Sequence, residues 1–158
     1  MKFLHPEFIE IIKALNDSDA EYLIIGGYAV NYHGFGRPTG DLDIWLKPDN
    51  ENKAKCVTAF RKLKYKEHSL EKLSTLDFEK PQVFYVGEPP LRIEFLTQVN
   101  LAKFDEAWET KETLSLENVT IPVINYKHLI LTKINTGRTQ DKLDLEELQK
   151  IKKEDNSN

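Results

Sequence analysis

Three short stretches of the sequence carry residue types that could act together on a phosphate group. Gly26-Gly27 is followed thirteen residues later by Asp41-Leu42-Asp43, and Glu94 lies in a later predicted strand. Side chains two residues apart in a strand share one face, about 6.6 Å apart along the chain, so Asp41 and Asp43 project together. Because neighbouring carboxylates repel each other unless they share a cation, this pair predicts a site for divalent metal ions.

A pair of Mg²⁺ ions about 3.5 to 4 Å apart, bound by carboxylate oxygens and bridging substrate phosphates, suits two acids in this arrangement. Glu94 lies on the polar face of a predicted strand over 91–96. If that strand pairs with the strand of Asp41, Glu94 supplies a third carboxylate. We therefore predict Asp41, Asp43 and Glu94 as metal ligands and catalytic residues, with Mg²⁺ as cofactor and Mn²⁺ as an alternative.

The glycine pair and a nearby arginine predict where phosphates would bind. Gly26 and Gly27 follow an apolar β-forming run over 22–25 and precede a segment with helical character. Glycines at such a junction let the backbone approach a ligand, and the first N–H groups of a helix can bind a phosphate. Arg37, in the loop before the aspartates, could clamp a phosphate with its planar donor fork. This arrangement predicts a triphosphate beside the metal ions.

The elements that must position these residues can be assigned from apolar periodicity, glycines and prolines. Helices are expected over 6–15, 28–32, 50–63, 103–108, 125–136 and 139–151, and strands over 22–25, 41–46, 82–86, 91–96, 113–116 and 119–123. Charged and small polar residues from 152 onward predict a disordered tail over 152–158. We expect a single domain over 1–151.

Composition excludes several classes of protein. The 158 residues contain 22 Lys plus Arg, 26 Asp plus Glu and one cysteine, with a net charge of −4. An acidic chain is a poor candidate for sequence-blind coating of nucleic acid. The lone Cys56 excludes an intramolecular disulfide framework and a cysteine zinc cluster. Apolar runs are too short to cross a membrane, so we expect a soluble, cytoplasmic protein with no membrane partner.

Longer motifs extend the pattern. The segments Gly26-Gly27-Tyr28-Ala29-Val30 and Gly36-Arg37-Pro38-Thr39-Gly40-Asp41-Leu42-Asp43-Ile44, with Lys133, Gly137-Arg138, Asp141 and Asp144, resemble the nucleotidyltransferase superfamily related to DNA polymerase beta. Within it, the chain resembles minimal nucleotidyltransferases of the AbiEii toxin kind and related small domains. The resemblance spans about 22–148.

This resemblance implies an α+β nucleotidyltransferase fold, with a mixed β-sheet flanked by helices and a C-terminal helical segment. It implies that Asp41 and Asp43 bind Mg²⁺, and that Glu94 is the third acid, as ligand or as general base. Glu94 stands where the superfamily commonly has Asp. The predicted nucleotide-binding residues are Gly26, Gly27, Arg37, Thr39 and Lys133. Arg138, Asp141 and Asp144 form either a helix-start charge network or part of the catalytic machinery.

The predicted activity is Mg²⁺-dependent transfer of a nucleoside monophosphate from a nucleoside triphosphate (NTP) to an acceptor hydroxyl. The resemblance favours an RNA 3′ end or a partner protein over a small molecule as acceptor, and suggests the toxin of a toxin–antitoxin pair with a cognate antitoxin. The alternatives are a nucleotide- or partner-binding relative without catalytic activity and a metal-dependent phosphohydrolase. The four scattered histidines are expected to be packing or surface residues.

Overall fold

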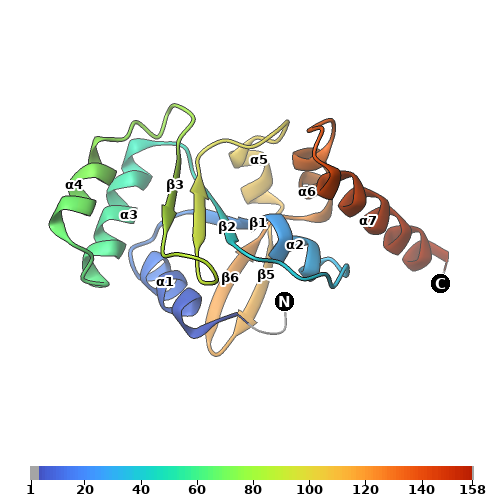
Figure 1. Ribbon diagram of the computed structural model, residues 1–158, viewed down its shortest axis with the longest axis horizontal. Helices are drawn as coiled ribbons and strands as arrows, with labels where there is room; N and C mark the ends of the chain where they lie inside the picture. Colours follow the sequence, from blue (N-terminus) through green and yellow to red (C-terminus); the bar gives the residue numbers. More distant parts are fainter. Residues whose placement is uncertain (1–3, 158) are drawn as a thin grey trace.

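The computed structural model describes residues 4–157 and has a mixed β-sheet at its centre. Its strands are β1 (Tyr22–Ile25), β2 (Leu42–Leu46), β3 (Val83–Val86), β4 (Ile93–Leu96), β5 (Glu112–Leu116) and β6 (Val119–Val123). They are arranged in the order β3-β4-β2-β1-β6-β5 (Figure 1). The β2–β4 and β1–β6 pairs are parallel, whereas β1–β2, β3–β4 and β5–β6 are antiparallel. The predicted mixed sheet is therefore confirmed.

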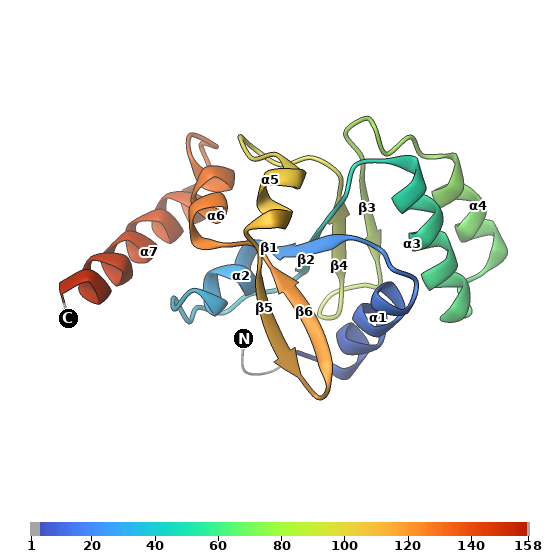
Figure 2. The ribbon, with the colours of Figure 1, turned by 180° about the vertical axis from the view of Figure 1, so that it is seen from behind.

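The helices lie at the two ends of this sheet and on both of its faces. They are α1 (Pro6–Asp17), α2 (Gly26–Tyr32), α3 (Asn50–Lys62), α4 (Glu67–Thr75), α5 (Phe104–Glu109), α6 (Tyr126–Lys133) and α7 (Thr139–Ser157). Phe60 of α3 packs against Phe95, and Phe104 of α5 packs against Trp45 on the opposite face. In Figure 1, α3 and α4 lie at one end of the molecule and α6 and α7 at the other. From behind, α1 lies beside α3 and β6 (Figure 2).

The core forms where alternate strand residues meet α3. Leu42 and Ile44 of β2 are fully buried, and they share their face with Phe95 of β4. Phe95 stacks on Phe84 of β3 at 5.0 Å between ring centroids and meets Phe60 of α3 edge-on at 5.6 Å. Because strand side chains alternate, burying this face turns Asp43, Glu94 and their neighbours to the opposite side of the sheet.

The structure differs from the sequence prediction in three segments. α4 was not predicted, although its buried Leu70 and Leu73 have helical spacing. The helix expected over 125–136 ends at Lys133. The expected disordered tail over 152–158 is wrong for 152–157, which continue α7, while residue 158 lies outside the described residues. Lysine and glutamate favour helices, and the Lys152 ammonium lies 5.3 Å from the centre of the Tyr126 ring, which anchors the last turns.

Two further findings concern the sequence predictions on membranes and cysteine. Within residues 4–157, no helix combines the length and the apolar character needed to span a bilayer. Cys56 is buried on α3, and this burial raises the pKa of its thiol to about 12. The thiol is therefore a core group and not a nucleophile.

The buried Asn52 connects the entry to β1 with the exit from β2. Its side chain accepts a hydrogen bond from the Glu21 N–H at 2.8 Å and donates to the carbonyls of Glu21 and Lys47 at 3.0 and 3.2 Å. We expect Asn52→Ala to lower the free energy of unfolding by about 1–3 kcal/mol, because it leaves the Glu21 N–H and the Glu21 and Lys47 carbonyls without their hydrogen-bond partner. Urea denaturation measures this loss. Thr58→Ala, at an exposed position on the same helix, is the control, and an equal effect of both changes would contradict the prediction.

Candidate active site

Strand pairing brings Asp43 and Glu94 together. They are directly opposite in the parallel β2–β4 pair and so share one face of the sheet. On its other side Asp43 is opposite Ile25, the last residue of β1, in the antiparallel β1–β2 pair. Asp43 therefore lies between Glu94 and the point where β1 turns into α2.

The two glycines at that turn are needed for close packing against predicted site residues. Gly26 has φ +66°, and a Cβ there would collide with the carboxylate of Asp43. A Cβ at Gly27 would collide with the Thr39 hydroxyl and come within 3.3 Å of the Arg37 guanidinium. The structure thus brings Asp43, Thr39 and Arg37 against the backbone of the glycine turn.

The acid pair is electrostatically unfavourable by itself. The pKa of Asp43 is raised from 3.8 to about 7, first by burial and then by the negative charges of Glu94 and Asp41. Lys133 and Arg138 oppose this shift without cancelling it. A carboxylate with such a pKa has too little positive charge around it, and a bound cation would favour its ionised form.

Asp41 is held differently from the other two acids. Its Oδ2 accepts a hydrogen bond from Arg92 Nε at 2.8 Å, and Arg92 Nη2 lies 2.7 Å from the same oxygen in an ion pair. The Arg92 guanidinium also lies 4.7 Å from the centre of the Tyr85 ring. Across residues 4–157, no three Asp, Glu, His or Cys side chains are grouped closely enough to hold one metal ion. The pairing of Asp43 and Glu94 is thus observed, whereas Asp41 is bound to an arginine.

Arg37 and Lys133 meet at one buried carboxylate of α7. Asp144, which is fully buried, accepts two parallel hydrogen bonds from Arg37, at 2.7 and 2.8 Å. Lys133 Nζ lies 2.9 Å from Asp144 and 3.1 Å from Asp141. Burial alone would raise the pKa of Asp144, but the bonds from Arg37, Lys133 and Gln140 outweigh it and hold the pKa below its ordinary value.

Asp141 has a second set of partners. It accepts hydrogen bonds from the Thr136 hydroxyl at 2.6 Å and from Arg138 Nε at 2.9 Å. Arg138 itself is 74% exposed, so it can reach solvent or a ligand. The three cations Arg37, Lys133 and Arg138 share two carboxylates and retain one net positive charge. These contacts form a charge network at the start of α7, and a catalytic role of Arg138, Asp141 and Asp144 stays a prediction.

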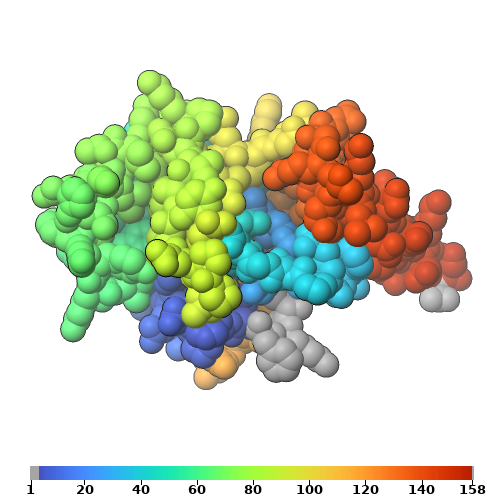
Figure 3. All heavy atoms as spheres, viewed as in Figure 1, coloured from blue at the N-terminus to red at the C-terminus, as the bar shows by residue number. Residues whose placement is uncertain are grey.

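Most of the predicted site residues line one cavity of about 450 Å³, namely Gly26, Gly27, Arg37, Asp43, Glu94 and Lys133. Asp41 and Thr39 are not among its lining residues. Its wall also contains Arg138 and Asp141, which the sequence had singled out, and residues that the sequence did not indicate, namely Ile25, Leu96, Gln98, Val99, Asn100, Thr132 and Gln140. Figure 3 shows a hollow between the yellow-green surface of β3 and β4 and the orange-red surface of α6 and α7, with cyan and blue segments at its floor.

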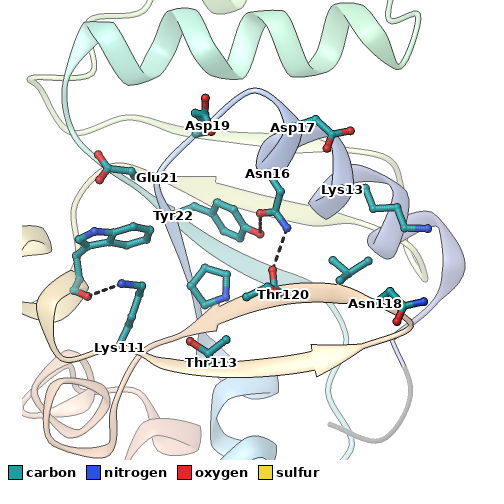
Figure 4. A pocket seen from close by; sticks show the side chains of 14 residues that line it. Lys13, Asn16, Asp17, Asp19, Glu21, Tyr22, Lys111, Thr113, Asn118 and Thr120 are labelled. Atoms are coloured by element: carbon teal, nitrogen blue, oxygen red, sulfur yellow. Dashed lines mark hydrogen bonds between the residues drawn. The ribbon is translucent and has the colours of Figure 1, made fainter.

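A second hollow, of about 640 Å³, lies at the opposite end of β1 (Figure 4). There the Tyr22 hydroxyl donates to Asn16 at 2.7 Å, and the Asn16 amide donates to the Thr120 carbonyl at 2.9 Å. Its central polar groups therefore satisfy one another. The predicted acids all lie elsewhere, so the cavity of Asp43 and Glu94 is the candidate active site.

Comparison with known families agrees with this geometry. The family described as "Nucleotidyl transferase of unknown function (DUF2204)" matches residues 5–158. The chain belongs to this family. The predicted nucleotidyltransferase superfamily and enzyme class are thereby confirmed, while the finer resemblance to AbiEii-type toxins stays a prediction.

Solved structures of nucleotidyltransferases align with this chain at low sequence identity. TM1012 of Thermotoga maritima, a proposed nucleotidyltransferase, aligns with a TM-score of 0.50 at 14% identity, over 94% of this chain and 96% of that one. The lincosamide antibiotic adenylyltransferase LnuA, bound to lincomycin, gives 0.48 at 15% identity over 94% and 98% of the two chains. ANT(2″)-Ia, in complex with adenylyl-2″-tobramycin, gives 0.49 at 11% over 96% and 95%. A search of curated proteins returns no match.

The raised pKa of Asp43 predicts a pH-dependent stability for this nucleotidyltransferase. Between about pH 4 and pH 7 the folded protein binds a proton that the unfolded chain has lost, so stability falls as pH rises through this range. Without divalent cations, we expect Asp43→Asn to raise the free energy of unfolding at pH 8, by up to about 4 kcal/mol. At pH 4 the change should have little effect.

Urea unfolding of both proteins at pH 4, 6 and 8 measures this difference. Asp17→Asn, an exposed acid at the end of α1, is the control and should keep the pH dependence of the parent protein. An Asp43→Asn variant with the same pH dependence as the parent would show that Asp43 ionises normally.

The buried network of the nucleotidyltransferase should be costly to break. We expect Asp144→Asn to lower the free energy of unfolding by about 3–5 kcal/mol, because Arg37 and the buried Lys133 lose their shared anion. Chemical denaturation at pH 7 checks this value. Glu147→Gln, which removes a partner of Lys150 from the same helix, should change stability by less than about 1 kcal/mol. Equal losses in the two variants would disprove the special role of Asp144.

Proposed function

We propose that this nucleotidyltransferase moves a nucleoside monophosphate from an NTP to an acceptor hydroxyl, with Mg²⁺ bound at Asp43 and Glu94. The observation that carries the proposal is the pairing of these two acids at the glycine turn, inside a cavity whose other wall is cationic. Acids on one side and Arg37 and Arg138 on the other are what a metal–triphosphate complex requires.

The raised pKa of Asp43 supports a cation at this position. Nucleotidyltransferases generally use divalent metal ions, and Asp43 and Glu94 offer the hard oxygen ligands that Mg²⁺ prefers. Mn²⁺ would suit the same oxygens. Arg92 contacts only Oδ2 of Asp41, so in its predicted role as a ligand Asp41 would bind the metal through Oδ1 or exchange Arg92 for it. When bound, the metal neutralises negative charge on the phosphates and on the acids.

The remaining predicted residues would hold the triphosphate. The backbone of Gly26 and Gly27 allows close approach, and Thr39 and Arg37 lie directly against Gly27. Arg37 keeps its Nη1 free of carboxylates, since this nitrogen donates to the Pro38 carbonyl at 3.2 Å. Lys133 is buried between two aspartates and would act through its electric field. Together these residues would orient the α-phosphorus of the bound NTP toward the acid pair.

The reaction then needs one proton acceptor. The acceptor oxygen attacks the α-phosphorus, the bond to the bridging oxygen of the β-phosphate breaks, and pyrophosphate leaves with the electron pair. In the alternative role predicted for Glu94, as general base and not as metal ligand, its carboxylate beside Asp43 would receive the hydroxyl proton. The proposed acceptor is an RNA 3′ end or a partner protein, and a role as toxin with a cognate antitoxin belongs to the same proposal.

A transfer assay tests this function. The full-length protein is incubated with each of the four α-³²P-labelled NTPs, Mg²⁺ and a bacterial extract, and the label in the acceptor is measured. We expect transfer that requires Mg²⁺ and falls at least about 100-fold in Asp43→Asn, because a ligand of the phosphate-bound metal is lost. Asp17→Asn should remain fully active. Transfer that survives Asp43→Asn would overturn the proposal, and nucleotide binding without any transfer would favour a non-catalytic relative.

A further inference from the structure

The edge strand β3 lies beside a hollow that is separate from the candidate active site. This hollow, of about 420 Å³, lies between β3 and α4. Three of the five exposed large hydrophobic side chains in residues 4–157 line it, namely Tyr65, Val83 and Tyr85, which are 37%, 56% and 52% exposed. The rest of its wall has apolar side chains, apart from Ser69 and Lys72. Exposed apolar groups gathered at one place are typical of an interaction surface.

The backbone of β3 turns hydrogen-bonding groups away from the sheet. β3 is the last strand on its side, with β4 as its neighbour. Directly before the strand, the Thr97 N–H donates to the Gln82 carbonyl at 3.1 Å. Residues that bond a neighbour alternate along an antiparallel strand, so every second residue from Gln82 onward turns its N–H and C=O toward β4. Those of Val83 and Tyr85 therefore point outward, where another strand could bind them.

The sequence of β3 does not protect this edge. Natural edge strands usually discourage pairing with further strands through charged side chains, prolines or a covering element. Residues 83–86 contain neither a charged residue nor a proline. The strand at the other edge, β5, begins with the charged Glu112, which accepts a hydrogen bond from the Tyr32 hydroxyl of α2 at 3.4 Å. β3 is therefore the edge that is suited to a further strand.

Two opposite charges at the ends of β3 indicate which strand would pair with it. Lys80 and Glu88 lie on either side of the strand, and both are exposed. In the part of the chain that the structure describes, neither forms an ion pair. Both are four residues from Phe84, so antiparallel pairing of two β3 strands about Phe84 puts Lys80 of each copy opposite Glu88 of the other. The β3 edge is thus complementary in charge to itself.

The same register pairs the outward backbone groups. Val83 of each copy is then opposite Tyr85 of the other, and each pair exchanges two N–H···O=C hydrogen bonds, which gives four bonds in all. The exposed Tyr85 ring packs against the exposed Val83 side chain as an aromatic–β-branched pair. A two-fold axis uses the same edge in both copies, so the assembly closes and no β3 edge remains for a third chain.

We infer that the β3 edge binds a second copy of this chain, which joins two six-stranded sheets into one antiparallel dimer. The two-fold axis is perpendicular to the sheet, so both copies present Asp43 and Glu94 on the same face. Five strand spacings of about 4.8 Å separate the two Asp43 residues, or roughly 24 Å. The active-site cavity and the hollow beside β3 share no lining residue, so both candidate active sites stay open. This inference does not depend on the proposed nucleotidyl transfer.

Sedimentation velocity of the full-length protein, from about 1 to 100 µM, tests the dimer. We expect a monomer–dimer equilibrium with a dissociation constant of about 10 µM or lower. A monomer at every concentration would overturn the inference. Growth into larger species as the concentration rises would also overturn it, because the two-fold pairing closes after two copies.

A charge on the strand itself tests whether β3 forms the contact. Val83→Lys enters the interface twice, once from each copy, and should raise the dissociation constant at least about tenfold. Leu143→Lys adds the same charge at an exposed hydrophobic position of α7, and it should dimerise like the parent. Circular dichroism shows whether each variant is folded. A folded Val83→Lys protein with the dissociation constant of the parent would overturn the inference.

Charge reversal tests the register without changing the strand. Lys80→Glu and Glu88→Lys should each raise the dissociation constant about tenfold, because each creates two like-charge contacts. The double variant Lys80→Glu/Glu88→Lys exchanges the charges and should restore the value of the parent. Single variants that dimerise like the parent, or a double variant as weak as the single ones, would disprove the antiparallel pairing of β3 about Phe84.

Discussion

Repulsion between Asp43 and Glu94 is the constraint around which this molecule is built. The parallel pairing of β2 with β4 puts these carboxylates side by side, and the antiparallel pairing of β2 with β1 encloses Asp43 on its other side. Burial then raises the pKa of Asp43 to about 7. Two neighbouring carboxylates of this kind lower the stability of the fold unless a bound cation neutralises them. Ionisable groups with such strongly shifted pKa values are common at functional sites.

The cations of the site are restrained in a complementary way. Arg37 and Lys133 could have neutralised Asp43 directly, but α7 binds them through Asp141 and Asp144. The charges are thus separated into an acidic wall on the sheet and a weakly positive wall on α6 and α7. A metal–triphosphate complex carries both signs of charge, so its metal ion could bind at the acidic wall and its phosphates at the positive wall.

The sequence predicted the enzyme class, but it did not predict which charged side chains contact one another. Gly26, Gly27 and Asp43 could be placed because a strand–glycine–helix junction and an acid pair have a local spacing that survives in any fold of this class. The pairing of Asp43 with Glu94 needed only the correct neighbour for one strand. By contrast, the bond of Asp41 to Arg92 depends on side-chain directions across two strands, and the sharing of Asp144 by Arg37 and Lys133 joins residues 107 positions apart. No local pattern encodes these choices.

The C-terminal segment 152–157 and strand β3 are two further places where local sequence patterns did not predict the tertiary structure. Composition alone predicted disorder after residue 151, yet α7 continues to Ser157 and Lys152 makes a tertiary contact with the ring of Tyr126. Alternation in 82–86 predicted a strand, but not that Val83 and Tyr85 would lie at the sheet edge without a covering helix. Exposure of this strand follows from strand order. Because β3 is the last strand on that side, no further strand covers Val83 and Tyr85, and both side chains stay exposed.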